Sequence, residues 1–348
     1  MAGIFEKSVV AVGKRGVSSS CLSHTSSTLF RSQRNATLSQ LLPVIAVRHS
    51  SHSPMGHPPT NARPKVTLNT LTSMYKKGDP ITMLTAYDFP SAHVADHAGM
   101  DMILVGDSLA MVALGLEDTS EVTLEEMIMC SRAVSRAVKG AFTVGDLPMG
   151  SYEISPQQAM TSAFRLLKEG RVQSVKLEGG ASMAPTIKAM TDAGIPVLAH
   201  IGLTPQRQHA LGGFRVQGKT VKSAMALLHD ALAVQEAGAY AVVLEAVPAP
   251  IAEMVTKKLR IPTIGIGAGN GTSGQVLVQV DMLGNFPPGR YVPKFVKRYG
   301  DVWSEALKGI EAYKEEVKSR AYPAEEHGYA VKEEVVNNFQ ALLEKGDQ

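Results

Sequence analysis

The chain has 348 residues, of which 44% are hydrophobic and 19% charged, a composition typical of a soluble globular protein with enough chain to bury a full core. No apolar run approaches the roughly 20 residues that a membrane-spanning helix needs. The formal charge of +3 is uneven, because residues 1–65 carry eight Lys and Arg against Glu6 alone, which leaves about −4 for the remainder. We therefore expect neither a membrane nor a nucleic acid as partner, since nucleic-acid binding needs a clustered basic face.

The first 60 residues have the composition of an organellar transit peptide. Between Lys7 and Lys77 there is no Asp or Glu, while Ser, Thr and Arg are frequent, as such peptides require. Arg48 followed by His49 resembles a mitochondrial processing site, and the Pro-containing stretch after it is typical of a linker. We predict a mitochondrial transit peptide and linker over residues 1–60 and a location in the mitochondrial matrix. A tail without targeting meaning is the alternative.

From residue 67 onward, short β-branched runs alternate with amphipathic segments, which indicates repeated βα units and a parallel sheet. Eight strands favour closure into a (β/α)8 TIM barrel, whose usual length is about 250 residues, over an open doubly wound sheet. The predicted strands are residues 81–88, 102–107, 142–147, 174–178, 196–201, 240–246, 261–266 and 275–282.

These elements predict one catalytic barrel over residues 61–330. A helix at residues 67–77 is expected to cap the N-terminal end of the barrel, and a helix at residues 301–318 is expected to close it. Residues 331–348 form a C-terminal extension that is amphipathic around Phe339. This extension is expected to pack either on the barrel or on a neighbouring subunit.

Charged and polar residues stand at the ends of five consecutive predicted strands, which is where the active site of a βα barrel lies. One such residue could be a structural ion pair, since a buried charge must be paired, but five in a row make that explanation improbable. The residues are Asp107 and Ser108 on the second strand, Asp146 on the third, Lys176 and Glu178 on the fourth, His200 on the fifth and Glu245 on the sixth.

Asp107, Asp146 and Glu178 come from adjacent strands and offer only oxygen, which suits Mg²⁺. Zinc is disfavoured, because no Cys and only one His lie near them. A Mg²⁺ ion held there can chelate a 2-oxo acid through its ketone and carboxylate oxygens and stabilise the enolate that forms when a base removes the neighbouring proton. Glu245, one strand further round, is placed to be that base.

The other residues at the strand ends have candidate roles in binding the substrate. Lys176 and Glu178 are two residues apart, so on a strand both face the same side and can enter one pocket. Lys176 would neutralise the substrate carboxylate or the enolate, and Ser108 could donate a hydrogen bond to the same carboxylate. For His200, a substrate contact and a structural hydrogen bond are equally open.

Two further patterns are weaker. Residues 269–274 contain a formal GxGxxG, but the glycines lead into a predicted strand and not into a helix, so a dinucleotide site is disfavoured. The favoured interpretation is that these glycines allow tight turns and a close approach of the backbone at the mouth of the barrel. His93 and His97 are four residues apart on the first helix, where surface or packing roles are favoured over metal binding.

Taken together, these motifs resemble the ketopantoate hydroxymethyltransferase family over residues 67–329. The resemblance implies a barrel of the phosphoenolpyruvate-mutase-like kind. It is carried by the segments TAYD (85–88), VGDSL (105–109), DLP (146–148), VKLEGG (175–180), GLTPQ (202–206), GGFRVQG (212–218), GIGAG (265–269) and YPAEEH (322–327).

The resemblance implies a specific reaction, the transfer of a hydroxymethyl group from 5,10-methylenetetrahydrofolate to 3-methyl-2-oxobutanoate. The product, 2-dehydropantoate, belongs to pantothenate (vitamin B5) biosynthesis. By the same resemblance the chain forms a large homo-oligomer. Site roles follow from it as well: Mg²⁺ at Asp107, Asp146 and Glu178, oxo-acid contacts at Ser108, Lys176 and the two aspartates, and proton acceptance at Glu245.

The eighth predicted strand departs from the family pattern, because Val280 precedes Asp281 where a histidine is expected. Two other functions remain as alternatives.

The first alternative is a Mg²⁺-dependent carbon–carbon lyase or mutase of the phosphoenolpyruvate-mutase kind, which would have the same barrel but would not use folate. Such enzymes commonly carry a reactive cysteine on a mobile loop, whereas Cys130 lies in a predicted helix. A non-catalytic, metabolite-binding barrel is disfavoured by the intact acidic set.

Overall fold

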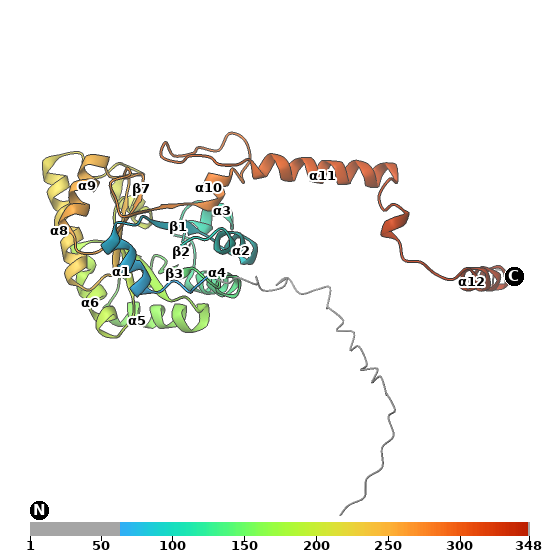
Figure 1. Cartoon of the computed structure of the whole chain (residues 1–348), viewed down its shortest axis with the longest axis horizontal. Helices are drawn as coiled ribbons and strands as arrows, with labels where there is room; N and C mark the ends of the chain where they lie inside the picture. Colours follow the sequence, from blue (N-terminus) through green and yellow to red (C-terminus); the bar gives the residue numbers. More distant parts are fainter. Residues whose placement is uncertain (1–62, 347–348) are drawn as a thin grey trace, which may run out of the picture. The chain divides into compact units, whose positions relative to one another are not determined.

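Eight parallel strands form a closed barrel, which bears out the predicted TIM barrel (Figure 1). The computed structural model describes residues 63–346. The strands follow one another round the barrel in chain order, and the last pairs with the first. They are β1 (Ile81–Thr85), β2 (Met102–Val105), β3 (Phe142–Asp146), β4 (Ser174–Glu178), β5 (Val197–Gly202), β6 (Ala241–Glu245), β7 (Thr263–Ile266) and β8 (Gly274–Leu277).

Strand alternation divides the core into two apolar clusters, since successive side chains point to opposite faces of a strand. One cluster fills the barrel and includes Met83, Met102, Phe142 and Ile264. The larger cluster lies between the strands and the outer helices. The charged residues of the inner face lie toward the C-terminal ends of the strands, where Lys176 and its neighbours are buried.

Helices follow each of the first six strands and surround the barrel (Figure 1). Several begin at a Thr or Asp whose side chain accepts a backbone N–H of the first turn, which stabilises the helix start. The outer helices are α2 (Phe89–His97), α4 (Leu124–Ala137), α5 (Pro156–Arg165), α6 (Ala184–Asp192), α8 (Val221–Glu236) and α9 (Ala249–Lys258). Shorter helices are α3 (Leu109–Val112), α7 (Gln208–Leu211) and α10 (Gln279–Leu283).

The last two strands differ from a regular βα repeat. Residues 267–273 join β7 to β8 through a loop without a helix. The predicted strand 275–282 is too long, because β8 ends at Leu277 and α10 begins at Gln279. The backbone N–H of Gln279 donates to the Thr85 hydroxyl at 3.0 Å, so it is not available to a strand ladder.

The predicted N-terminal cap is confirmed as α1 (Leu68–Lys77). Thr67 accepts the backbone N–H of Thr70 and begins the helix. Leu71 of α1 and the preceding Val66 belong to the apolar cluster inside the barrel, so this segment covers the N-terminal end of the barrel. Burying apolar side chains there removes the end of the barrel core from water.

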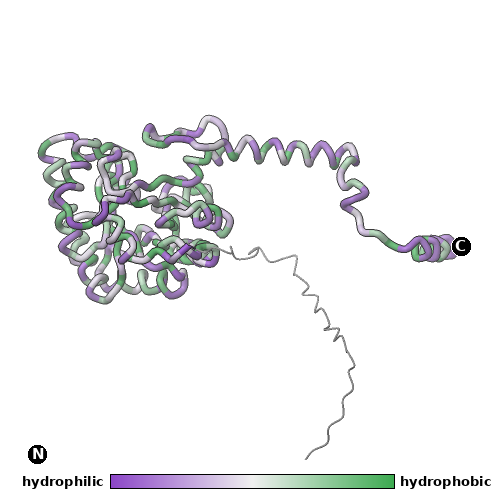
Figure 2. Tube along the Cα trace, in the orientation of Figure 1, coloured by the Kyte–Doolittle hydropathy of each residue, from purple (hydrophilic) through white to green (hydrophobic). Residues whose placement is uncertain are grey.

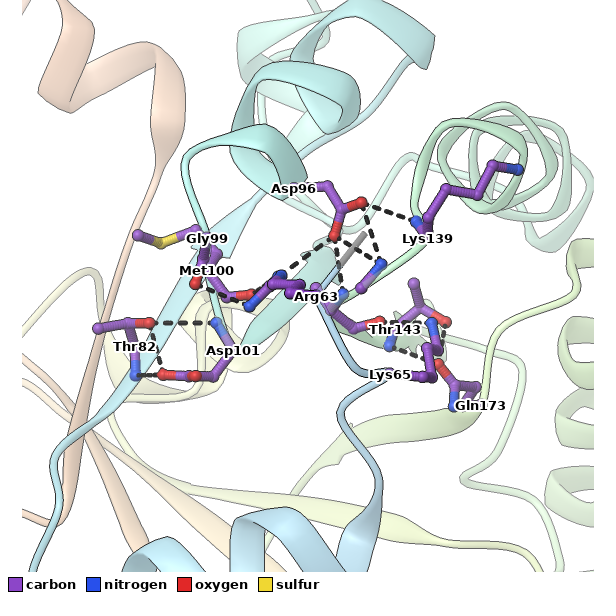
Figure 3. A network of polar contacts seen from close by, with 12 residues as sticks. Arg63, Lys65, Thr82, Asp96, Gly99, Met100, Asp101, Lys139, Thr143 and Gln173 are labelled. Carbon is purple, nitrogen blue, oxygen red and sulfur yellow. Dashed lines mark hydrogen bonds and ion pairs between the residues drawn. The ribbon is translucent and has the colours of Figure 1, made fainter. Parts of the chain in front are cut away.

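A polar network holds the segment before α1 against the barrel (Figure 3). The Asp96 carboxylate accepts the backbone N–H groups of Lys139 at 2.7 Å, Ala141 at 2.7 Å and Gly140 at 3.1 Å. The Arg63 guanidinium pairs with the same carboxylate at 3.2 Å. Asp96 therefore ties the end of α2 both to the start of β3 and to the first described residue.

Replacing Asp96 with Asn is expected to destabilise the fold by about 1–3 kcal/mol at neutral pH, because charge-assisted hydrogen bonds are lost. Burial alone would raise the pKa of Asp96, but the three backbone N–H groups and Arg63 outweigh burial and lower it. A carboxyl with a lowered pKa stabilises the fold above its unfolded pKa and loses that effect as the pH falls through its folded pKa. The difference between wild type and variant should therefore shrink below about pH 4.

Urea unfolding at a series of pH values measures this difference. Asp79→Asn is the matched control, since Asp79 is exposed and its replacement is expected to change stability little. A difference that stays constant down to about pH 3 would contradict the role given to the Asp96 carboxylate.

The two C-terminal helices are α11 (Val302–Ser319) and α12 (Glu333–Gly346). Polar and apolar residues alternate along α11 (Figure 2). The predicted closing helix is present, and none of its side chains is buried. Phe339 of α12 is also exposed.

None of the helices in residues 63–346 combines the length and apolarity needed to span a bilayer.

Candidate active site

The barrel brings all the predicted site residues to one end. Each of them lies within its strand or a few residues after it, on strands β2 to β6. Asp146 is the register partner of Lys176, and Glu178 is the partner of His200. The side chains of Asp107, Asp146, Lys176, Glu178 and His200 are buried, whereas Ser108 and Glu245 are partly exposed.

Lys176 and Asp146 form a buried ion pair, with 2.8 Å between Nζ and Oδ1. The second Asp146 oxygen accepts the backbone N–H of Asp107 at 3.0 Å, which joins β3 to the loop after β2. Burial alone would lower the pKa of Lys176, but the carboxylates of Asp146, Asp107 and Glu178 outweigh burial and raise it. Lys176 therefore stays positively charged at neutral pH.

The site holds more acidic than basic groups. Burial, followed by repulsion from Asp146, raises the pKa of Asp107 to about 7. Burial, followed by repulsion from Asp107, also raises the pKa of Glu178 well above its ordinary value. Lys176 is the one lysine among these groups, and raised carboxyl pKa values are typical of sites that lack positive charge.

Gln206 and Tyr152 complete the site, and the sequence patterns gave neither of them a role. The Gln206 amide donates to Asp107 Oδ2 at 2.8 Å, and its backbone N–H donates to Glu178 Oε2 at 3.1 Å. The Tyr152 hydroxyl donates to Gln206 Oε1 at 2.6 Å. Both side chains are almost fully buried. Gln206 lies within the GLTPQ segment, and its place just after β5 is the signal that could have identified it.

His200 lies between two carboxylates. Its Nδ1 is 3.5 Å from Glu178 Oε1 and its Nε2 is 3.3 Å from Glu245 Oε2. Neither ring nitrogen forms a hydrogen bond of normal geometry, although both are buried. Leaving buried ring nitrogens without hydrogen-bond partners costs free energy. The His200 ring can therefore gain a hydrogen bond from a group that enters the site.

The donor set fits a hard cation. Asp107, Asp146 and Glu178 supply buried oxygen ligands with surplus negative charge. Within the described residues, no three acidic, histidine or cysteine side chains are grouped closely enough to hold a metal ion by themselves. Mg²⁺ commonly takes only one or two protein carboxylates and fills its remaining positions with water and substrate. The metal roles of these three residues remain a prediction.

The weaker sequence patterns have structural explanations. Gly269, with φ of 76°, lies in the loop that leads into β8, and a Cβ there would lie 2.3 Å from the Ala249 Cβ, so close approach explains the glycine. His93 and His97 are exposed on α2. Asp281, beside the position expected to hold a histidine, lies in α10 and pairs with Arg290 at 3.2 Å.

Comparison with known proteins identifies the family. The profile of ketopantoate hydroxymethyltransferase matches residues 65–325. The chain belongs to the ketopantoate hydroxymethyltransferase family. A 3-methyl-2-oxobutanoate hydroxymethyltransferase of Emericella nidulans is 69% identical over 300 residues, which cover 86% of each chain. A protein of the same name from Oleidesulfovibrio alaskensis is 55% identical, covering 77% of this chain and 92% of its own.

Solved structures agree with the barrel fold. Phosphonopyruvate hydrolase aligns with a TM-score of 0.50 at 12% identity and covers 82% of this chain and 98% of its own. A 2,3-dimethylmalate lyase, described as a member of the PEP mutase/isocitrate lyase superfamily, aligns with a TM-score of 0.49 at 16% identity, covering 80% and 96%. The expectation of a hydroxymethyltransferase on a TIM barrel is thus confirmed at the level of family and fold.

Proposed function

We propose that this ketopantoate hydroxymethyltransferase uses 5,10-methylenetetrahydrofolate to hydroxymethylate 3-methyl-2-oxobutanoate, giving 2-dehydropantoate for pantothenate biosynthesis. The observation that carries the proposal is the juxtaposition of Lys176 with a surplus of buried carboxylates at the barrel end, next to the more exposed Glu245. The names of the similar proteins support the same substrate.

The buried groups would bind the 2-oxo acid. Asp107, Asp146 and Glu178 would hold Mg²⁺, which when bound polarises the oxo group and stabilises negative charge on the substrate. Lys176 lies beside Asp146 and would supply a fixed positive charge for the carboxylate of the substrate. Ser108, partly exposed directly after Asp107, would donate a hydrogen bond to that carboxylate.

Glu245 would act as the base. Its carboxylate would accept the proton from C3 as the C3–H bond breaks, and His200 Nε2 lies 3.3 Å from that carboxylate. C3 then bonds to the one-carbon unit. The two bonds from this carbon to the nitrogens of the carrier are replaced by the new C–C bond and a bond to oxygen from water. The proton from C3 and one proton from water end on the carrier, so atoms balance.

Exchange of the C3 proton of 3-methyl-2-oxobutanoate with solvent, followed by NMR, tests the proposal. The mature protein should catalyse exchange with Mg²⁺ present and lose most of it when the metal is removed by a chelator, because the charge that develops on the substrate is then uncompensated. No exchange by the metal-loaded protein, even with tetrahydrofolate present, would instead favour a lyase or non-catalytic function.

We also propose that residues 1–60 direct the chain to the mitochondrial matrix. They lie outside the described residues, so the support is their composition, with basic residues and no acidic residue after Glu6. A fluorescent protein fused behind residue 60 should enter mitochondria. The same fusion with Arg31, Arg34 and Arg48 replaced by Asn should stay in the cytosol, and cytosolic signal from the unaltered leader would refute the proposal.

The expected homo-oligomer is likewise a proposal. Exposed apolar side chains on α11 and α12, among them Ile310, Tyr313, Phe339 and Leu342, support it, because isolated helices rarely leave such faces uncovered. Sedimentation of the mature protein at the mass of one chain would contradict it.

A further inference from the structure

A hollow of about 710 Å³ opens at the rim of the barrel, next to the proposed base. Its wall begins at Ala246, the residue that follows Glu245 at the end of β6. The loop after β7 also lines the hollow, with Gly267 and Asn270. Hollows of roughly 300–1,000 Å³ are the size that binds small organic molecules.

The backbone conformation of Ala246 holds this part of the lining next to Glu245, the proposed base. Ala246 has φ of 50°, a left-handed conformation that is uncommon for a residue other than glycine. Its N–H donates to the Ile266 carbonyl and its carbonyl accepts the Gln217 N–H, both at 2.9 Å. Such conformations persist where the surrounding structure enforces them and gather at functional sites. Glu245 and the hollow are therefore held together by the same turn.

The lining suits a flat heteroaromatic molecule with an anionic end. Apolar groups are supplied by Val216, Val247, Pro248, Ala249 and Phe295, and amides by Asn270 and Gln275. The Phe295 ring lies against Gly267, where an added Cβ would be 2.7 Å from the ring. Lys294 brings a positive charge to the edge of the hollow.

A second hollow at the same end of the barrel has different chemistry. It measures about 410 Å³ and is lined by Glu117, Asp118, Gln208, His209, Gly212 and Gly213. Its two acidic side chains would repel an anionic ligand, and no aromatic carbon ring such as that of Phe295 is present for stacking.

We propose that the hollow beside Glu245 binds the folate carrier of the one-carbon unit. The ring system of the carrier stacks on Phe295 and packs against Pro248, and its carboxylate tail pairs with Lys294. This inference rests on the proposed function and gives the co-substrate a site separate from the buried oxo-acid site. The carrier thereby presents its one-carbon unit to the substrate carbon from which Glu245 removes the proton.

Binding of tetrahydrofolate, measured by calorimetry on the mature protein, tests the site. Phe295→Ala should raise the Kd about tenfold or more, as loss of a stacked aromatic ring does for nucleobases. Lys294→Ala should raise the Kd a few-fold and make it less dependent on salt. Tyr291→Ala and Lys297→Ala are matched controls, since both residues are exposed on the same segment outside the hollow, and both variants should bind as the wild type does.

Steady-state kinetics give the second readout. In the Phe295 and Lys294 variants, the KM for 5,10-methylenetetrahydrofolate should rise while the KM for the oxo acid stays within about twofold. Unchanged carrier binding and KM in both variants would overturn this site. If the wild type also failed to exchange the C3 proton of the oxo acid, the proposed function itself would fall, so the two failures are distinguishable.

Discussion

Replacing Glu245 with Gln should lower turnover by about 10²–10⁴-fold, the usual contribution of a general base. The change keeps the size of the side chain and removes only its ability to accept a proton. Because Glu245 is the least buried carboxylate of the set, with 15% of its side chain exposed, the substitution should leave stability nearly unchanged. C3-proton exchange should fall with turnover, since both require the same C–H bond to break.

The exchange assay and kcat, measured on the same metal-loaded preparations, check this expectation. Glu253→Gln is the matched control, because Glu253 lies exposed on α9 and pairs with the exposed Lys257. That variant should exchange and turn over at the wild-type rate. Wild-type exchange by Glu245→Gln would show that another group removes the proton, and His200, whose ring is within 3.3 Å of Glu245, would be the next candidate.

Replacing Lys176 with Met is expected to cost about 3–5 kcal/mol of stability, because it removes one partner of a buried ion pair and leaves Asp146 without its cation. The Lys176 side chain is 5% exposed and that of Asp146 is 2% exposed, so water cannot replace the lost charge. Activity should fall by at least about 10²-fold, since the fixed positive charge at the oxo-acid site disappears.

Urea unfolding of the metal-free protein measures the stability effect. Adding Asp146→Asn to Lys176→Met should recover part of the lost stability without restoring activity, because it removes the unpaired charge but not the need for a cation at the substrate. Lys188→Met is the control, since its pair with Asp192 is exposed on α6 and should contribute under about 1 kcal/mol. Equal unfolding midpoints for Lys176→Met and Lys188→Met would contradict the buried ion pair.

The sequence was sufficient to predict the barrel and the position of its site. The alternation of short apolar runs with amphipathic segments is a local property of the chain, and it predicted strands that lie within a few residues of the observed ones. Parallel strands in a barrel all end at the same rim. Asp107, Asp146, Glu178 and Glu245 could therefore be grouped before any distance between them was known.

Element ends near the last strand were harder to predict. Residues 275–282 form an apolar run that is compatible with a strand, yet the strand ends before Gln279, whose N–H donates to the Thr85 hydroxyl nearly 200 positions away in the chain. A helix was also predicted at residues 301–318 and is observed as α11, but its amphipathic pattern does not specify what covers its apolar face. Such choices depend on long-range contacts, which periodicity does not encode.

Only the tertiary structure decided which residues of the site are hydrogen-bonded to one another. Gln206 and Tyr152 are joined to Asp107 and Glu178 by hydrogen bonds between loops, whose conformations follow no sequence period. The position of His200 between two carboxylates depends on the register of β4, β5 and β6. The sequence by itself determined which residues reach the rim of the barrel, because strand direction and alternation are local. The structure determined their partners, because partners are set by contacts between segments far apart in the chain.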